Sequence, residues 1–147
     1  ADQSERLILI DSMGNTGDAA FVDVLSTELS AQSTATRRRA ADAISRLPAE
    51  QARPALLDAL VQESDPQVST ALIDALKHAG ATSPELVDVL EKRINSSDAN
   101  QRAATIDLLG SQQTERAQQL LIVQYKRETD AQLKMQIGRY VPARALR

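Results

Sequence analysis

The residue types best suited to chemistry are sparse in this chain of 147 residues. The single histidine, His78, would need close partners to act as a general base or a metal ligand. Asp74 lies four residues earlier, on the same face of an expected helix. A lone His–Asp pair is a weak motif. We therefore expect His78 to be partly exposed near a helix C-terminus, where a positive charge is favourable.

Three consecutive arginines, Arg37, Arg38 and Arg39, form the most pronounced charge run. Arginine binds phosphate and carboxylate groups through paired hydrogen bonds, so the run could hold a phosphate or an acidic peptide. Three cations in the first turn of a helix oppose the helix dipole, and we expect Asp42 and Glu50 to help balance them. The alternative is that Arg37 has a structural role that repeats along the chain, whereas Arg38 and Arg39 are solvated.

Other signatures of catalysis are missing from the sequence. Cysteine is absent, which excludes thiol catalysis, disulfides and cysteine-ligated metals. The segment from Gly14 to Gly17 lacks the lysine and the preceding strand of a phosphate-binding loop, and no serine has the context of a nucleophile elbow. We therefore predict that the chain is not an enzyme and that it has no catalytic residues, no cofactor and no metal site.

The elements that would position these residues repeat along the chain. A basic residue is followed by apolar or small residues three, six and seven positions later. This basic slot recurs after 31, 32, 33 and 32 residues, and it is filled by Arg6, Arg37, Ser69 (in place of a basic residue), Arg102 and Lys134. Helical repeats of this length stack into a solenoid, in which each repeat packs on its neighbours.

Each copy predicts a helical hairpin whose helix starts are marked. Four residues before each basic slot stands a side chain that can cap a helix: Asp2, Ser33, Asp65, Asp98 and Asp130. We expect Gly14, Gly80 and Gly110 to end first helices in a left-handed turn. Pro54 is interpreted as a late start of its helix, whereas Gly138 falls inside a predicted helix without an explanation.

The pattern predicts nine helices and no strand. Their approximate ranges are 3–13, 18–30, 34–47, 50–62, 66–79, 84–96, 99–109, 114–127 and 131–141. The corresponding repeats are about 1–32, 33–64, 65–97, 98–129 and, as a partial unit, 130–147. We expect a single domain over 1–147 that is a segment of a longer protein, because the last repeat lacks a full second helix.

Composition narrows the choice of partner. The net charge of −3 and the pI of about 5.2 disfavour nucleic acid, which proteins bind mainly through lysine and arginine on phosphates. The aromatic residues are only Phe21, Tyr125 and Tyr140, too few for a base-stacking platform. No apolar run approaches the ~18 residues of a membrane span. We expect a protein or peptide partner, with the oligomeric state and the compartment, cytoplasmic or periplasmic, left open.

The repeats resemble HEAT repeats, in the short bacterial form that is also seen in phycobilin lyases. The likeness is clearest in Asp98-Ala-Asn-Gln-Arg102-Ala-Ala-Thr-Ile-Asp-Leu-Leu-Gly110 and in Thr36-Arg-Arg-Arg-Ala-Ala-Asp-Ala-Ile44, and it covers nearly the whole chain. It implies an all-α fold, a right-handed α-solenoid of about 4.5 stacked hairpins, and a role as a binding scaffold. Because Ser69 replaces the usual arginine, we expect a ladder of polar contacts between repeats to be interrupted there.

In such arrays the second helices line the concave face, so the resemblance also implies where a partner binds. Asp23 and Asp88 share one slot on these helices, with Gln119 in the same row. Catalysis by paired carboxylates would need a desolvated cleft, which a shallow curved surface does not offer, whereas a basic or mixed partner could bind there. The predicted partner-binding residues are Asp23, Asp58, Asp88, Glu91, Gln119, Arg38 and Arg39.

Two other functions remain open at this point. The segment from Ser12 to Asp18 is similar to turns in the helical domain of vitellogenin-type lipid carriers. That resemblance implies a helical arch beside an apolar cavity supplied by other domains, and it predicts an apolar inner face, to which Leu57, Val61, Ile122 and Val123 would contribute. The third possibility is a lyase of the phycobilin type, for which one histidine and three aromatic residues give little to hold a tetrapyrrole.

Overall fold

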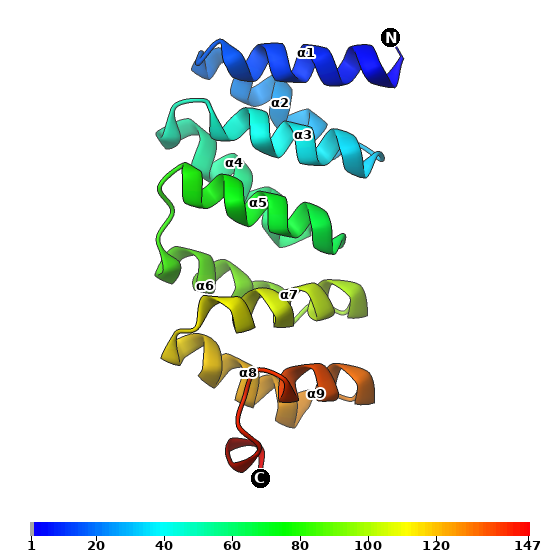
Figure 1. Cartoon of the computed structure of the whole chain (residues 1–147), viewed down its shortest axis with the longest axis vertical. Coiled ribbons are helices and arrows are strands. Elements are labelled where there is room, and N and C mark those ends of the chain that lie inside the picture. Colours follow the sequence, from blue (N-terminus) through cyan, green and yellow to red (C-terminus); the bar gives the residue numbers. More distant parts are fainter. Residues whose placement is uncertain (1) are drawn as a thin grey trace. The chain divides into compact units, whose positions relative to one another are not determined.

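In the computed structural model, which describes residues 2–147, every regular element is helical. The α-helices of this part of the chain are α1 (Gln3–Asn15), α2 (Val22–Glu28), α3 (Thr34–Ser45), α4 (Ala49–Gln62), α5 (Pro66–His78), α6 (Ser83–Arg93), α7 (Ala99–Gln112), α8 (Glu115–Arg127) and α9 (Ala131–Gly138) (Figure 1). Two 3-10 helices are η1 (Ala19–Phe21) and η2 (Ala143–Leu146). The prediction of an all-α fold is confirmed.

The helix starts follow from the capping side chains. Asp2, Ser33, Asp65, Asp98 and Asp130 each accept a hydrogen bond from a backbone N–H in the first turn of the helix that follows. The carboxylate of Asp2, for example, accepts from the N–H of Glu5 at 2.8 Å. Each cap satisfies a donor that would otherwise lack a partner, which is typically worth about 1 kcal/mol. The predicted caps are therefore confirmed in all five first helices.

The largest differences from the predicted ranges lie at α2 and α9. The segment predicted as 18–30 begins with η1, whose start is capped by Asp18, and only then continues as α2. Helix α9 ends at Gly138 rather than at residue 141. Pro142 explains the early end, because a proline disfavours helical backbone at the residue before it. Glycine is also a poor helix former, and Gly138 is the last residue of α9.

Of the three glycines predicted to end first helices in a left-handed turn, one does so and two lie inside a helix. Gly80 has the expected left-handed backbone, with φ of 84°. Gly14 and Gly110 instead lie inside α1 and α7, so the prediction of left-handed turns at these two positions is wrong. A Cβ atom on Gly14 would lie 2.8 Å from the Cα of Ala43, and one on Gly110 would lie 2.3 Å from the ring of Tyr140. These glycines let the next first helix approach closely.

Pro54 lies inside α4, so its interpretation as a late helix start is also wrong. The helix already starts at Ala49, and the N–H groups of Gln51 and Ala52 donate to the carbonyl of Pro48 at 3.1 and 3.0 Å. Pro54 has no N–H and cannot donate to the carbonyl of Glu50. The missing hydrogen bond falls on the exposed side of α4, where Pro54 lines a groove.

The described residues form two compact units, one up to Thr82 and one from Ser83 onwards. In the first unit the first helices of successive hairpins, α1, α3 and α5, pack side by side, and the second helices α2 and α4 do the same (Figure 1). The side chains of Leu25, Ile44, Leu56 and Leu76 between these layers are fully buried. Burial of apolar surface between neighbouring hairpins is the main stabilising contribution in this arrangement.

The second unit repeats this packing. Helix α7 packs on α6, α8 and α9, and η2 packs on α8. Its core contains Leu90, Leu109, Leu121 and Ile137, none of which is exposed. In both units, hairpins thus pack on adjacent hairpins rather than around one central core, which is the packing of an α-solenoid.

Candidate protein-binding surface

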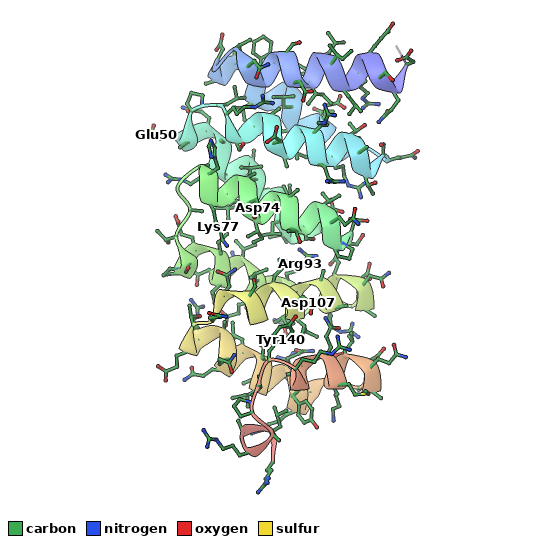
Figure 2. All side chains as sticks on the ribbon, viewed as in Figure 1. Glu50, Asp74, Lys77, Arg93, Asp107 and Tyr140 are labelled. Atoms are coloured by element: carbon green, nitrogen blue, oxygen red, sulfur yellow. The ribbon has the colours of Figure 1, made fainter. Side chains whose placement is uncertain are left out.

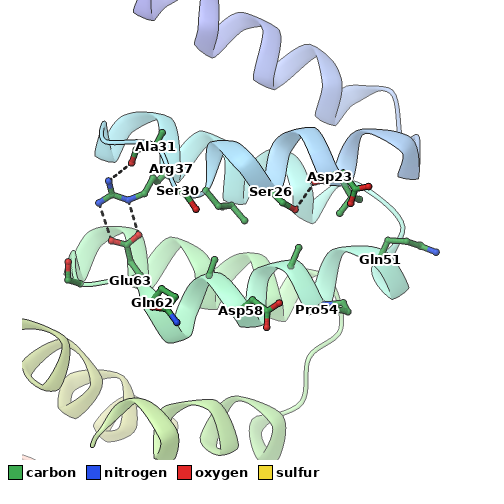
Figure 3. A pocket seen from close by; sticks show the side chains of 15 residues that line it. Asp23, Ser26, Ser30, Ala31, Arg37, Gln51, Pro54, Asp58, Gln62 and Glu63 are labelled. Atoms are coloured by element: carbon green, nitrogen blue, oxygen red, sulfur yellow. Dashed lines mark hydrogen bonds and ion pairs between the residues drawn. The ribbon is translucent and has the colours of Figure 1, made fainter. Parts of the chain in front are cut away.

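In the second repeat the basic slot is occupied by an arginine that binds two other parts of the chain. Arg37 donates from Nε and Nη2 to the carboxylate of Glu63 at 2.9 and 3.1 Å. Its Nη1 donates to the backbone carbonyls of Ala31 and Gln32 at 2.8 and 2.9 Å (Figure 3). We call this arrangement the arginine clasp. It joins the start of α3 to the residue that follows α4 and to the segment that precedes α3.

The fourth repeat has the same clasp. Arg102 donates from Nε to both oxygens of Glu128 at 3.0 and 3.2 Å, and from Nη1 to the carbonyls of Ser96 and Ser97. The side chain of Glu128 is only 2% exposed and also accepts from Gln124. A buried carboxylate with this many donors is held firmly, because each donor replaces a lost contact with water.

The clasp bears on the expected polar contacts between repeats, and it contains glutamates that the sequence analysis did not name. Its ion pair lies within one repeat, whereas its hydrogen bonds to backbone carbonyls reach the last residues of the preceding repeat. The expected polar contacts between repeats are therefore present at Arg37 and Arg102, with the backbone as acceptor. Its glutamates were not predicted, although Glu63 and Glu128 both follow their arginine by 26 residues, a spacing that is visible in the sequence. Arg6 binds Glu28 in the first repeat, and the Oγ of Ser69 in the third is buried without a hydrogen-bond partner within residues 2–147.

A groove of about 730 Å³ lies between α2 and α4, the second helices of the first two repeats. Asp23 on α2 and Asp58 on α4 line it from its two sides, and the Arg37–Glu63 pair lies at one end (Figure 3). Small side chains, Ala55 and Ala59, leave room along α4. The complete lining is Val22, Asp23, Ser26, Leu29, Ser30, Ala31, Arg37, Gln51, Pro54, Ala55, Asp58, Ala59, Gln62, Glu63 and Ser64.

The two aspartates of this groove differ from its glutamate in their partners. Glu63 is buried and is bound by Arg37. The carboxylates of Asp23 and Asp58 are exposed, and neither has a hydrogen bond or an ion pair within the described part of the chain. The groove therefore presents two acidic side chains that are available to a cation from another molecule.

The two predicted acidic binding residues of the third repeat, Asp88 and Glu91, are paired with an arginine of the same chain. Arg116 on α8 binds both Asp88 and Glu91 on α6. The carboxylate of Asp88, and after it that of Glu91, raises the pKa of the Arg116 guanidinium above its usual value. All three side chains are about half exposed, so the contribution of these pairs to stability is small. Asp88 and Glu91 thus differ from Asp23 and Asp58, which no cation of the described chain neutralises.

The remaining predicted binding residues lie elsewhere. Arg38 and Arg39 are exposed on α3, a first helix, and do not line the groove between the second helices. Gln119 is exposed on α8, where its side chain donates to Glu115 at 3.4 Å. Of the seven predicted binding residues, the structure brings only Asp23 and Asp58 into this groove.

The charge of the arginine run is balanced differently from the expectation. Arg39 binds Asp11 on the neighbouring first helix α1. Asp42 instead binds Arg46 at 3.3 Å, and that arginine also contacts Asn15. The expectation that Asp42 and Glu50 balance the run is therefore wrong for Arg39, because a partner from an adjacent repeat lies closer.

His78 is exposed at the last residue of α5, as predicted. It lines a shallow depression of about 440 Å³ together with Asp42 and Asp74, between the first helices α3 and α5. Within residues 2–147, no group of three histidine or carboxylate side chains is arranged to hold a metal ion. None of the helices described is both long and apolar enough to cross a bilayer.

Tyr140, which follows α9, makes a polar contact with the neighbouring first helix α7 that was not predicted. Its hydroxyl donates to Asp107 at 2.6 Å, next to the ring's contact with Gly110 (Figure 2). Burial raises the pKa of Tyr140 to about 12, and the hydrogen bond to the Asp107 carboxylate acts in the same direction. The neutral hydroxyl is thus held as a donor between α7 and the segment after α9.

The repeated hairpins with capped first helices match a known family of helical repeats. A sequence profile of HEAT repeats matches residues 1–77 and 54–139. The chain belongs to the HEAT-repeat family. The groove therefore lies between the second helices of two successive HEAT repeats. A comparison with curated proteins finds no match to this chain.

Proposed function

We propose that this HEAT-repeat chain is a non-enzymatic scaffold for protein–protein interaction and that a basic segment of its partner binds in the groove between α2 and α4. The observation that carries the proposal is the pair Asp23 and Asp58, which line one groove from two helices without a cation of their own. A lysine or arginine side chain of a partner would supply the missing charge.

The open shape of the groove favours binding over catalysis. Acid–base chemistry by two carboxylates requires a water-excluding site that separates their pKa values, whereas Asp23 and Asp58 are both exposed to solvent. Exposed ion pairs contribute only about 0–1 kcal/mol each, so affinity would also depend on backbone and side-chain contacts along the groove. We expect binding to weaken as ionic strength rises, because salt screens exposed charges.

The lipid-carrier alternative receives less support from the same surface. Of the residues expected to form an apolar inner face, Leu57 and Val61 belong to α4 but do not line the groove. The groove is lined instead by aspartate, serine and glutamine side chains together with small apolar ones.

The test uses a displayed library of random linear peptides, selected on the immobilised chain. Affinities of the recovered peptides are then measured by fluorescence polarisation. We expect lysine and arginine to be enriched, and we expect the double variant Asp23→Lys/Asp58→Lys to bind at least about tenfold more weakly.

The matched control is Glu5→Lys/Asp74→Lys, which changes the net charge equally but on the exposed surface of first helices. It should retain the affinity of the wild-type chain within about twofold. Recovered peptides without basic residues, or an equal loss in both double variants, would contradict the proposal.

A further inference from the structure

The second helices can be aligned residue by residue, because each carries a fully buried leucine at the same place of the repeat. These leucines are Leu25 in α2, Leu56 in α4, Leu90 in α6 and Leu121 in α8. Counted from its leucine, each position of one second helix has an equivalent in the others that lies on the same side of the helix. The pair α2 and α4 can therefore be compared with the pair α6 and α8.

The later pair shows how a guanidinium binds between second helices. Arg116, five residues before the leucine of α8, donates to Asp88 and Glu91 of α6. Asp88 lies two residues before the leucine of α6, and Glu91 lies one residue after it. The arginine thus reaches from one second helix to two acceptors on the preceding one, and it uses separate nitrogen atoms, Nη1 and Nη2, for the two carboxylates.

In the earlier pair the acceptors are present and the arginine is replaced. Asp23 and Ser26 of α2 occupy the positions that the two acids occupy in α6. Gln51 of α4, which is exposed, occupies the position of the arginine. The carboxylate of Asp23 and the hydroxyl oxygen of Ser26 can both accept hydrogen bonds, whereas a glutamine has no positive charge to offer the carboxylate. All three side chains line the groove between α2 and α4 (Figure 3).

The arginines nearest to this position are directed elsewhere. Arg37 lines the groove but is bound to Glu63, at the end away from Asp23 (Figure 3). Arg53 of α4 lies with its Nη1 3.6 Å from the place that a Cβ of Gly80 would take, in the segment after α5. Within residues 2–147, Asp23 is thus without the guanidinium that its equivalent in α6 binds.

We propose that the groove selects an arginine of its partner, and that this arginine takes beside Asp23 the place that Arg116 takes beside Asp88. The inference rests on the proposed function, which requires only a basic segment. A guanidinium can donate to the carboxylate of Asp23 and to the hydroxyl oxygen of Ser26 through separate nitrogen atoms, whereas the ammonium group of a lysine is a single point charge. In the later pair the chain's own arginine fills the equivalent place, so the partner's arginine is directed to the earlier one.

The test compares two fluorescein-labelled peptides of equal charge, hexa-arginine and hexa-lysine, by fluorescence polarisation at low ionic strength. The wild-type chain should bind hexa-arginine at least about threefold more tightly than hexa-lysine. Gln51→Arg should weaken binding of hexa-arginine at least about fivefold, because a side chain of the same molecule then fills the place beside Asp23 at a high effective concentration. Gln67→Arg adds the same charge on the exposed surface of the first helix α5 and should bind within about twofold of the wild-type chain.

The reverse exchange tests the later pair as the model for the earlier one. Arg116→Gln should release Asp88 and Glu91 and open a second place for an arginine, so the number of hexa-arginine molecules bound per chain should rise roughly from one to two in isothermal titration calorimetry. Circular dichroism should show unchanged helix content, because the ion pairs of Arg116 are exposed to solvent.

Three results would overturn the inference: equal affinity for the two peptides, a Gln51→Arg variant that binds like the wild-type chain, or an unchanged stoichiometry for Arg116→Gln. If the Asp23→Lys/Asp58→Lys variant still loses its affinity for basic peptides in those cases, the proposed function stands without the preference for arginine. A wild-type chain that binds neither peptide would contradict the inference and the proposed function together.

Discussion

At the scale of single residues, burial separates the ion pairs of this HEAT-repeat chain into two groups. The glutamates bound by Arg37 and Arg102 have side chains 6% and 2% exposed. The acids bound by Arg116 are about half exposed. Loss of an arginine from the first group leaves a buried carboxylate without its cation, whereas loss of Arg116 returns two carboxylates to water.

We therefore expect Arg102→Ala to lower the free energy of unfolding by about 3–5 kcal/mol, because Glu128 would remain buried without its arginine. Urea denaturation followed by circular dichroism measures the change. Arg116→Ala should lower the free energy of unfolding by no more than about 1 kcal/mol, because its ion pairs are exposed to solvent. Ser69→Ala, in the same slot of the third repeat, should cost less than Arg102→Ala because its buried hydroxyl has no partner in residues 2–147. Equal losses for Arg102→Ala and Arg116→Ala would contradict this assignment.

At the scale of elements, the distance between neighbouring first helices depends on glycine. Gly14 and Gly110 both occupy the position eight residues after the basic slot. Each receives a residue of the next first-helix segment, Ala43 and Tyr140 respectively, at the sixth position after its own slot. The same register thus accommodates the methyl group of Ala43 against α1 and the aromatic ring of Tyr140 against α7, because the glycine leaves space for both.

Gly110→Ala should lower the free energy of unfolding by about 1–3 kcal/mol, since its Cβ would overlap the Tyr140 ring and force a repacking of α7 and α9. Gly138→Ala is the matched control. Its Cβ would enter open space, and alanine favours the helix, so stability should be unchanged or higher by up to about 1 kcal/mol. Thermal or urea unfolding compares the two variants. A stabilising effect of Gly110→Ala would show that the contact with Tyr140 is not tight in solution.

At the scale of the whole molecule, stability in a HEAT array depends on how many neighbours each hairpin has. Within the first unit, α3 packs on both α1 and α5, whereas α1 packs on α3 and leaves Ile8 and Leu9 exposed. Opening of α1 therefore exposes less buried apolar surface than opening of α3. In repeat proteins the terms between nearest neighbours add approximately, so this difference should appear as a difference in local stability.

We expect the backbone amides of α1 to exchange with solvent at least about tenfold faster than those of α3 in dilute solution, because local opening costs less there. Hydrogen–deuterium exchange with mass spectrometry measures both helices in one experiment. Equal exchange in α1 and α3 at low concentration would contradict this account.

The helices, their starts and the repeat could be predicted because they depend on local features. A capping side chain binds an N–H two or three residues away, and apolar spacing shows which side of a helix is buried. Asp65 and Asp98 illustrate this, since each caps the helix that its position predicts. Pro54 was misjudged because it removes only one hydrogen bond, on the exposed side of α4, and the helix continues through it.

The sequence by itself determined that this chain is a series of capped helical hairpins, and that its acids and arginines occupy recurring slots. Only the tertiary structure decided which of those charges meet. Asp23 and Asp58 share a groove, Asp88 and Glu91 are bound by Arg116, and Gly110 faces Tyr140. The reason is that these contacts join residues some 25 to 35 positions apart, and the stacking of one hairpin on the next sets their distance.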